Sequence, residues 1–303
     1  MKLKTLRVSE NLREHISYGS HAIPLSICVD NFDDYFRKEW SCHWHDEFEC
    51  GVVLKGTAEY RIYDGQEKST VHKLQQGDGV FINTGCLHNA KGLEPDTVVA
   101  GFVFPIAFFD IKPFENIHRQ TILSIIESGI THLILNAADQ NDRLLLSSME
   151  EICAITGQEP GYELHCIEIV CRIWRLLTIR VLEKCKTTPA PAVNKTGEQR
   201  LKEMVSFIHA HFSEHIGVDA IARAAAISRT GCFRCFQAIL GKTPAEYLTE
   251  YRLSMATMLL ANTDRTLSDI SYACGFNSPS YFGKLFREQC GLSPKKYREQ
   301  IRR

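Results

Sequence analysis

The chain lacks the features that mark a membrane or exported protein. Its 303 residues contain no apolar run of about 18 residues, the length that a helix needs to cross a bilayer. The basic start, Met1 to Arg7, is followed by no apolar core, so it does not fit a secretory signal peptide. We therefore expect a cytoplasmic protein without a membrane partner, and the length predicts two domains.

The sequence also lacks an ordered set of cysteines and a large net charge. Its 12 cysteines are scattered without the spacing of a disulfide-rich domain, and the pair Cys232-Phe-Arg-Cys235 has no second pair nearby to form a zinc site. The net charge is -1, but residues 195–303 hold 16 Lys and Arg against 10 Asp and Glu, or +6, which leaves -7 for the remainder. An acidic front and a basic end fit a ligand-binding domain joined to a DNA-binding domain.

Two short helices joined by a sharp turn are predicted between Asp269 and Arg298. Gly275 ends the first helix. Asn277 or Ser278 can cap the second, which has Pro279 at its first position. This second helix has apolar residues on one side and small or basic residues on the other. That arrangement lets a helix pack on its partner while it enters a DNA groove.

The same pattern occurs about fifty residues earlier, so one unit is used twice. Ser228 and Gly241 match a serine and a glycine 50 positions later, whereas Ile221 matches an isoleucine 49 positions later. The second turn therefore holds one extra residue. Pro244 to Asn262 is predicted as one long helix between the units, a fixed spacer between two recognition helices.

Residues 200–303 resemble the DNA-binding domain of the AraC/XylS family of bacterial transcription regulators. The residues that carry the resemblance are Ile221-Ala, Ser228, Arg234, Phe236, Gly241, Pro244, Tyr247, Arg252, Ala256, Leu259-Leu260, Ile270, Ala273-Cys-Gly-Phe276, Tyr281-Phe282, Lys284, Phe286, Gly291, Ser293-Pro294 and Tyr297-Arg298. The family implies two helix-turn-helix motifs and control of transcription at promoters, with RNA polymerase as a partner if the protein is an activator.

The resemblance also implies which side chains face DNA. They are Thr230, Phe233 and Arg234 in the first recognition helix, and Ser280, Gly283 and Lys284 in the second, with Arg287 on the same side. Arg234 and Lys284 have the chemistry to bind guanine edges in the major groove. Their alternative role is to contact phosphate, which binds DNA without specifying its sequence.

The first third of the chain predicts short strands separated by turns. They lie near residues 25–30, 58–63, 71–74, 79–83 and 97–104, with no helix between them. This pattern is typical of a small barrel or jelly roll. His43 and His45 fall on one face of a strand because the side-chain period is two, and Glu49 has the same parity.

Residues from about 20 to 105 resemble the two cupin motifs. The first is His43-x-His45-x3-Glu49-x6-Gly56, and the second is Gly77-x5-Asn83-x-Gly85-x2-His88, in which Asn83 replaces the usual proline. In metal-binding cupins the matching residues bind one metal, and here they are His43, His45, Glu49 and His88. Three nitrogens and a carboxylate suit iron, manganese, nickel or zinc. The alternative is that these four side chains are polar groups of an effector pocket with apolar walls.

Helices are predicted at 117–128, 144–157 and 162–185. The last has a broad apolar stripe, which we expect to cover the barrel and also to meet a second subunit. The residues predicted for this homodimer interface are Ile167, Val170, Cys171, Trp174, Leu177 and Val181. The alternative is packing within one chain only.

The predicted fold is multidomain α+β. A cupin-like β-barrel or jelly roll spans residues 1–110, and a helical dimerisation and packing region spans 111–185. A linker at 186–199 leads to an all-α domain with two helix-turn-helix motifs at 200–303. The predicted function is a sequence-specific transcription regulator, not an enzyme, which binds double-stranded promoter DNA and a small-molecule effector such as a sugar or related nutrient. The alternative is a metal-dependent cupin enzyme with a helical accessory domain.

Overall fold

The chain forms two compact units in a computed structural model. The structure describes residues 4, 6, 8–9, 12–18, 23–63, 69–109, 118–155, 157, 160–187 and 195–301. The first, which we call the barrel unit, comprises residues 13–33 and 41–194. The second, which we call the helical unit, comprises residues 195–303 together with residues 1–12 and 34–40. No helix of the described residues is long and apolar enough to span a membrane.

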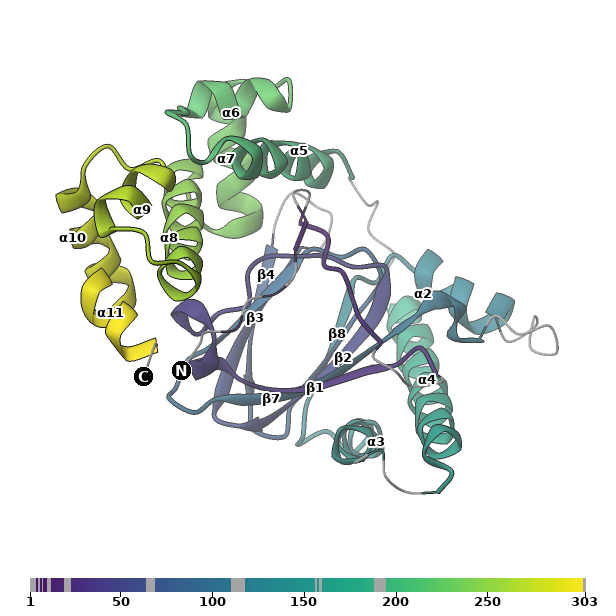
Figure 1. Ribbon diagram of the computed structural model, residues 1–303. Helices are drawn as coiled ribbons and strands as arrows, with labels where there is room; N and C mark the ends of the chain where they lie inside the picture. Colours follow the sequence, from purple (N-terminus) through teal and green to yellow (C-terminus); the bar gives the residue numbers. More distant parts are fainter. Residues whose placement is uncertain are drawn as a thin grey trace. The chain divides into compact units, whose positions relative to one another are not determined.

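The barrel unit contains two antiparallel sheets that face each other (Figure 1). The strands are β1 (Ser26–Asn31), β2 (Glu47–Lys55), β3 (Thr57–Tyr63), β4 (Ser69–Gln75), β5 (Gly79–Ile82), β6 (His88–Gly92), β7 (Val98–Pro105) and β8 (His132–Leu135). Their order is β1-β7-β2-β5-β8 in one sheet and β4-β3-β6 in the other. This arrangement confirms the predicted cupin-like barrel and adds β6 and β8, which were not predicted from the sequence.

The alternation along β2 separates the polar interior from the apolar exterior. Phe48, Cys50 and Val52 belong to the core that the five-stranded sheet forms with the helices. Glu49 lies between them in sequence and points to the opposite face, toward β6. The fold thereby turns one carboxylate into the space between the sheets.

Helices cover the outer face of the five-stranded sheet. They are α2 (Leu123–Glu127), which follows a π-helical turn (His118–Ile122), α3 (Arg143–Ala154) and α4 (Tyr162–Thr187). Among the described residues, single-turn 3-10 helices lie at Phe32–Asp34, Phe36–Lys38 and Ile106–Phe109. The positions of α2, α3 and α4 agree with the three predicted helices.

Most of the residues predicted for a dimer interface lie instead in the core of the barrel unit. Trp174 is 2% exposed, its ring centroid lies 4.6 Å from that of Phe48, and its indole Nε1 donates to Thr121 Oγ1 at 3.0 Å. The fully buried side chains are Val170, Leu177 and Val181, and Ile167 packs against the same core. The prediction for these residues was wrong because the chain's own sheet covers them. Cys171 alone of the six is exposed.

The helical unit is built from two similar halves. Its helices are α5 (Lys195–His211), α6 (Val218–Ala224), α7 (Arg229–Leu240), α8 (Pro244–Asn262), α9 (Leu267–Ala273), α10 (Pro279–Cys290) and α11 (Pro294–Ile301). The pairs α6–α7 and α9–α10 are the two helix-turn-helix motifs, and α8 connects them (Figure 1). α8 has the predicted bounds because Thr243 and Glu246 form a capping box and Pro244 occupies the first turn.

The predicted offset of 49 between the motifs is visible in their hydrogen bonds. In the first turn the backbone N–H of Ile227 donates to the carbonyl of Ala222 at 3.1 Å. In the second turn Phe276 donates to Ser271 at 3.0 Å. Asn277 is the extra residue, which confirms the unequal lengths of the two turns.

Part of the helical unit comes from a distant stretch of the sequence. Phe36, which lies between β1 and β2 in the sequence, packs against the core of α8, α10 and α11 that includes Phe286 and Tyr297. Next to it, Arg37 pairs with Glu250, and Lys242 Nζ lies 2.7 Å from Glu250 and 3.6 Å from Glu39. Residues 34–40 therefore form part of this unit's apolar and ionic contacts.

Residues 188–194 of the predicted linker lie outside the described residues. On either side, α4 extends to Thr187 and α5 begins at Lys195. Residues 186–187 and 195–199 of the predicted linker are thus helical, and residues 34–40 of the predicted barrel domain lie in the helical unit. The other predicted domain limits stay predictions.

Candidate DNA-binding surface and effector site

Each predicted recognition helix is fixed at both ends by its own sequence. α7 begins after Ser228, whose Oγ accepts a hydrogen bond from the Gly231 N–H at 3.1 Å. α10 begins after Ser278, whose Oγ accepts from Tyr281 at 3.4 Å. Both helices end at a glycine in the left-handed conformation. The two helices are therefore equivalent parts of the repeat.

The predicted DNA-contacting residues all lie on the faces turned away from the core. The buried side of α7 includes Cys232 and Phe236, and that of α10 includes Phe282 and Phe286. The exposed residues are Thr230, Arg234, Ser280, Lys284 and Arg287, while Phe233 and Gly283 are half-buried. This geometry leaves both basic faces accessible to a DNA groove.

The space around Gly283 in α10 would accommodate a larger side chain. A Cβ built on it would meet no described atom within 4 Å. Glycine weakens a helix by about 1 kcal/mol relative to alanine, and nothing in the described chain offsets this here. A small residue on this face would allow a close approach of the DNA backbone.

Two exposed residues of the motifs, Arg229 and Tyr281, were not predicted from the sequence to face DNA. Arg229 is exposed at the start of α7, where its Nη1 lies 3.0 Å from Asp219 Oδ2 and its guanidinium lies 5.9 Å from the Phe233 ring. Tyr281 is 56% exposed in α10. Their sequence positions next to the predicted residues could have indicated a role in DNA binding. An exposed arginine or tyrosine on a recognition helix can contact phosphate or bases.

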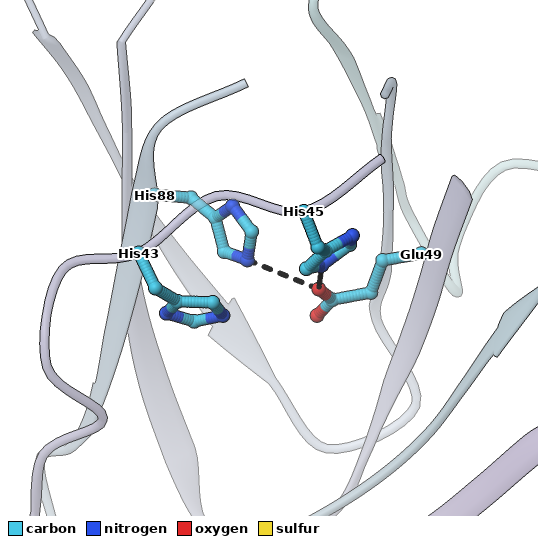
Figure 2. Close-up of side chains that lie close together, drawn as sticks. All are labelled: His43, His45, Glu49 and His88. Carbon is cyan, nitrogen blue, oxygen red and sulfur yellow. Dashed lines mark hydrogen bonds and ion pairs between the residues drawn. The ribbon is translucent and has the colours of Figure 1, made fainter. Parts of the chain in front are cut away.

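The four residues of the cupin motifs meet in the barrel interior. His43 and His45 lie just before β2, Glu49 lies within β2, and His88 begins β6. His43 and His88 exchange backbone hydrogen bonds of 3.0 and 2.9 Å, which join the two segments. All four side chains are buried, and one ligand atom from each lies within 4.8 Å of the others (Figure 2). We call this group the His/Glu cluster.

The hydrogen bonds of the cluster fix the tautomers of its histidines. The Nδ1 atoms of His43, His45 and His88 lie 2.8, 3.1 and 2.9 Å from the backbone carbonyls of residues 41, 47 and 86. A carbonyl oxygen only accepts, so each Nδ1 carries the hydrogen. In the neutral rings Nε2 is then a free acceptor that points into the cluster. This is the arrangement in which second-layer groups orient metal-binding histidines.

Two of these nitrogens converge on one carboxylate oxygen. Nε2 of His45 and Nε2 of His88 each lie 3.0 Å from Glu49 Oε2. Burial disfavours the charged carboxyl, but the charge of His88 and the hydrogen bonds from both histidines outweigh it, so the pKa of Glu49 lies well below its usual value. A nitrogen lone pair and a carboxylate oxygen only 3.0 Å apart repel each other unless a proton or a metal cation lies between them.

The pKa values of His43 and His45 are shifted in opposite directions. Burial, together with the neighbouring His88 and His45, holds the pKa of His43 well below its usual value. Burial also acts to lower the pKa of His45, but the hydrogen bond to Glu49 outweighs it and the pKa is raised. The cluster therefore favours a neutral His43 beside an ionised Glu49.

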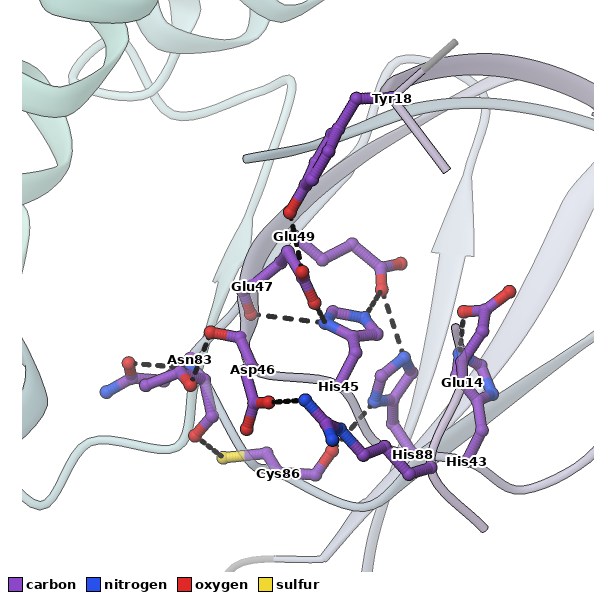
Figure 3. Close-up of polar contacts among 12 residues, drawn as sticks. Glu14, Tyr18, His43, His45, Asp46, Glu47, Glu49, Asn83, Cys86 and His88 are labelled. Atoms are coloured by element: carbon purple, nitrogen blue, oxygen red, sulfur yellow. Dashed lines mark hydrogen bonds and ion pairs between the residues drawn. The ribbon is translucent and has the colours of Figure 1, made fainter. Parts of the chain in front are cut away.

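A fifth residue of the site, Glu14, was not identified from the sequence. Its Oε2 lies 3.4 Å from His43 Nε2, and burial raises the pKa of its carboxyl to about 7 (Figure 3). The Glu14 backbone N–H donates to the Trp44 carbonyl at 2.8 Å. Nearby, Tyr18 donates to Glu47 Oε1 at 2.6 Å. The segment 13–18 thus lies against the cluster, and no local pattern in the sequence marked it.

Family models match both parts of the chain. One described as an AraC-like ligand binding domain matches residues 31–92, and one described as a helix-turn-helix domain matches residues 221–300. The first range holds the His/Glu cluster and the second holds both recognition helices.

Similar proteins match across both parts. The chain is 26% identical to the HTH-type transcriptional regulator YdeC of Bacillus subtilis (strain 168), over 98% of this chain and 99% of the relative. It is 31% identical to the HTH-type transcriptional activator RhaS of Enterobacter sp. (strain 638), over 75% of this chain and 83% of the relative. It is 25% identical to the lactose operon transcription activator of Staphylococcus xylosus, over 84% of this chain and 91% of the relative.

Proposed function

Because the chain belongs to the AraC family of transcription regulators, with a ligand-binding part and a DNA-binding part, we propose that its effector binds at the His/Glu cluster. The observation that carries this proposal is the convergence of three histidine nitrogens and one carboxylate in the barrel interior. Ionisable groups with shifted pKa values gather at functional sites, so a buried cluster of three histidines and a carboxylate is expected to serve binding.

We propose that the cluster holds a divalent transition metal ion. The residues that would bind it are His43, His45, Glu49 and His88. The ring orientations fit this role because each Nδ1 donates to a backbone carbonyl and each Nε2 would offer a lone pair once an ion replaced the protons shared with Glu49. A bound ion would supply a Lewis acid to which oxygen atoms of a small effector can bind. We place a sugar or related nutrient in this role, and the similarity to a lactose operon activator supports that class.

Metal analysis of the purified full-length protein tests this proposal. We expect about one ion per chain after incubation with zinc, nickel or manganese, and less than about a tenth of that in a Glu49→Gln/His88→Gln variant. Circular dichroism checks that the variant is folded. If the folded wild-type protein retains no ion, protons and not a metal neutralise the cluster.

We propose that α7 and α10 read promoter DNA through Thr230, Phe233 and Arg234 and through Ser280, Gly283, Lys284 and Arg287, respectively. Their exposure on two equivalent helices supports this role. Contacts from the basic residues to phosphate would make the affinity fall with salt concentration.

The change Arg234→Ala tests base contact by α7. If Arg234 binds a guanine, its loss should cost about 1–3 kcal/mol and relax the sequence preference at one base position. The measurement is a gel shift on the DNA upstream of the protein's own gene and on single-base variants of it. Arg143→Ala, an exposed arginine of α3 in the other unit, is the matched control. A loss that is equal for all sequences would make Arg234 a phosphate contact.

We further propose a homodimer that works in the cytoplasm, where promoter DNA lies. Two linked copies would bind a pair of sites more tightly than one copy binds a single site.

The alternative is a metal-dependent cupin enzyme, which the buried ligand set favours. Stoichiometric metal together with no DNA binding at low salt would support that alternative over the regulator.

A further inference from the structure

A pair of histidines joins the outer edges of the two sheets of the barrel unit. His72 lies in β4, the outer strand of the three-stranded sheet, and His132 begins β8, the outer strand of the five-stranded sheet. Their Nε2 atoms lie 2.9 Å apart, and their ring centroids lie 4.8 Å apart. Two side chains that are distant in the sequence thus meet through the nitrogen atoms that bind metal ions in proteins. We call them the edge histidines.

The edge histidines are separate from the His/Glu cluster. In the register of the five-stranded sheet, Ile82 lies between Glu49 and His132. In the other sheet, Ile62 lies between His88 and β4. Both isoleucines are 0% exposed. Apolar side chains therefore stand between the two groups of histidines, and the edge histidines need an explanation of their own.

Threonine hydroxyls border both rings. Thr131 Oγ1 lies 3.0 Å from His132 Nδ1. With the hydrogen of His132 on Nδ1, where Thr131 accepts it, Nε2 is an acceptor that points at His72. Thr70 Oγ1 lies 3.1 Å from His72 Nε2, on the other side of the contact. A partner on the far ring nitrogen, as Thr131 provides, is what orients metal-binding histidines.

Both rings are neutral at pH 7. Burial lowers the pKa of His132 to about 3, and the charges of His72 and Lys184 act in the same direction. Burial and the charge of Lys184 also lower the pKa of His72. Neutral imidazole is the form that binds a metal ion. Both side chains are only half-buried, so water has access to complete a coordination shell.

The spacing of the two nitrogen atoms matches ligands at right angles around one ion. Imidazole nitrogen binds zinc at about 2.0–2.1 Å. Two bonds of this length at 90° place their nitrogens about 2.9 Å apart, whereas the tetrahedral angle places them about 3.3 Å apart. Square-planar or tetragonal geometry is typical of nickel(II) and copper(II), and tetrahedral geometry of zinc. The separation of 2.9 Å between the Nε2 atoms of His72 and His132 therefore favours nickel(II) or copper(II).

We propose that His72 and His132 bind a divalent ion of the nickel(II) or copper(II) class through their Nε2 atoms. The ion takes the place of the hydrogen between the two nitrogens, and His72 then carries its hydrogen on Nδ1, so both rings stay neutral. The ion links β4 to β8 and joins the two sheets at this edge. With two protein ligands and water in the other positions, it dissociates when free metal is removed. It therefore does not add to the metal content of desalted protein.

Nickel binding at equilibrium tests this site. The background is the full-length Glu49→Gln/His88→Gln variant, in which the His/Glu cluster has lost two of its ligands. Isothermal titration calorimetry should show about one nickel ion per chain. His72→Gln and His132→Gln, each added to this background, should weaken nickel binding at least about tenfold. Circular dichroism checks that each variant is folded.

A third histidine serves as the matched control. His165 lies on α4 of the same unit, where its Nε2 is 3.5 Å from Glu151 Oε1. His165→Gln in the same background should leave nickel binding unchanged, because this ring is no part of the edge histidines. A loss as large as that of His72→Gln would show that nickel binds to surface histidines without selection, which would overturn the proposal.

The charge of Lys184 provides a test that keeps both histidines. Lys184 Nζ lies 3.4 Å from the backbone carbonyl of His132, and its ammonium group repels a cation nearby. Lys184→Gln should therefore strengthen nickel binding about threefold or more. A hydrogen-bonded pair of histidines that holds no ion would show no such gain, and an unchanged affinity would contradict the proposed position of the ion.

The outcomes separate this site from the proposed function. If the background variant binds no nickel, or binds it equally well after His72→Gln, the inference is overturned whatever the His/Glu cluster holds in the wild-type protein. If instead the wild-type cluster retains no ion, nickel binding by the background variant still decides whether the edge histidines form a site.

Discussion

At the scale of the residue, Ala226 adopts a backbone conformation that suits glycine. Its φ is 50°, and it lies in the turn of the first helix-turn-helix motif. The matching residue of the second motif is Gly275, with φ 79°. The left-handed region costs an alanine about 1–2 kcal/mol, so the first turn is strained where the second is not.

Ala226→Gly is therefore expected to stabilise the helical unit by about 1 kcal/mol, since Ala226 is exposed and its methyl group adds little packing. Gly275→Ala is expected to destabilise it by more than about 2 kcal/mol, because a Cβ there would overlap the Phe212 carbonyl oxygen. Urea unfolding followed by circular dichroism measures both. If Ala226→Gly does not raise the free energy of unfolding, the backbone at Ala226 is not strained.

The His/Glu cluster was predictable from residue spacing together with the resemblance to the cupin motifs, whereas its surroundings were not. His43, His45 and Glu49 lie within seven positions of one another, and His88 follows the turns that bring β6 beside them. Glu14 reaches the cluster from a stretch with no periodic pattern. The carbonyls that orient the histidines are backbone atoms, and side-chain identity does not reveal them.

At the scale of the element, α5 carries a half-buried histidine, His209. His209 stacks on Tyr251 with ring centroids 3.9 Å apart, and its Nε2 lies 2.9 Å from the Tyr247 hydroxyl. Burial lowers its pKa from 6.5 to about 4. The unfolded chain thus takes up a proton between these values while the folded chain does not. The contribution of His209 to folding stability is therefore fully present above pH 6.5 and is lost as the pH falls toward 4.

We expect this histidine to cost about 2 kcal/mol of stability between pH 7.5 and pH 5. His209→Gln should reduce the acid loss by that amount, which urea unfolding at the two pH values measures. The matched control is His211→Gln, two residues further along α5, where the side chain is more exposed and lies 2.9 Å from Glu214. A wild-type acid loss that His209→Gln leaves unchanged would contradict the assignment.

Elements with strong end signals were predicted well, and short or two-sided elements were not. α8 has a capping box and a proline at its start, and its predicted bounds were correct. β6 and β8 have five and four residues, too few to show a period. In α4 both faces hold apolar residues, so periodicity identified the helix but could not decide which face meets the sheet.

At the scale of the molecule, the helical unit depends on residues 34–40. Phe36→Ala in the full-length protein should open part of the apolar core beside Phe286 and speed amide hydrogen exchange in α10. A partly buried phenylalanine of this kind contributes about 1–3 kcal/mol. Exchange in α6 should not change, since α6 lies in the other half of the repeat. Equal acceleration in both helices would indicate global loosening instead.

The use of residues 34–40 has a consequence for protein engineering. A hybrid regulator made by joining residues 195–303 to a foreign sensor would leave behind Phe36 and the ionic partners of Lys242 and Glu250. Grafts of this C-terminal part are therefore expected to need a substitute for the lost contacts, such as a short peptide of residues 34–40 supplied in trans.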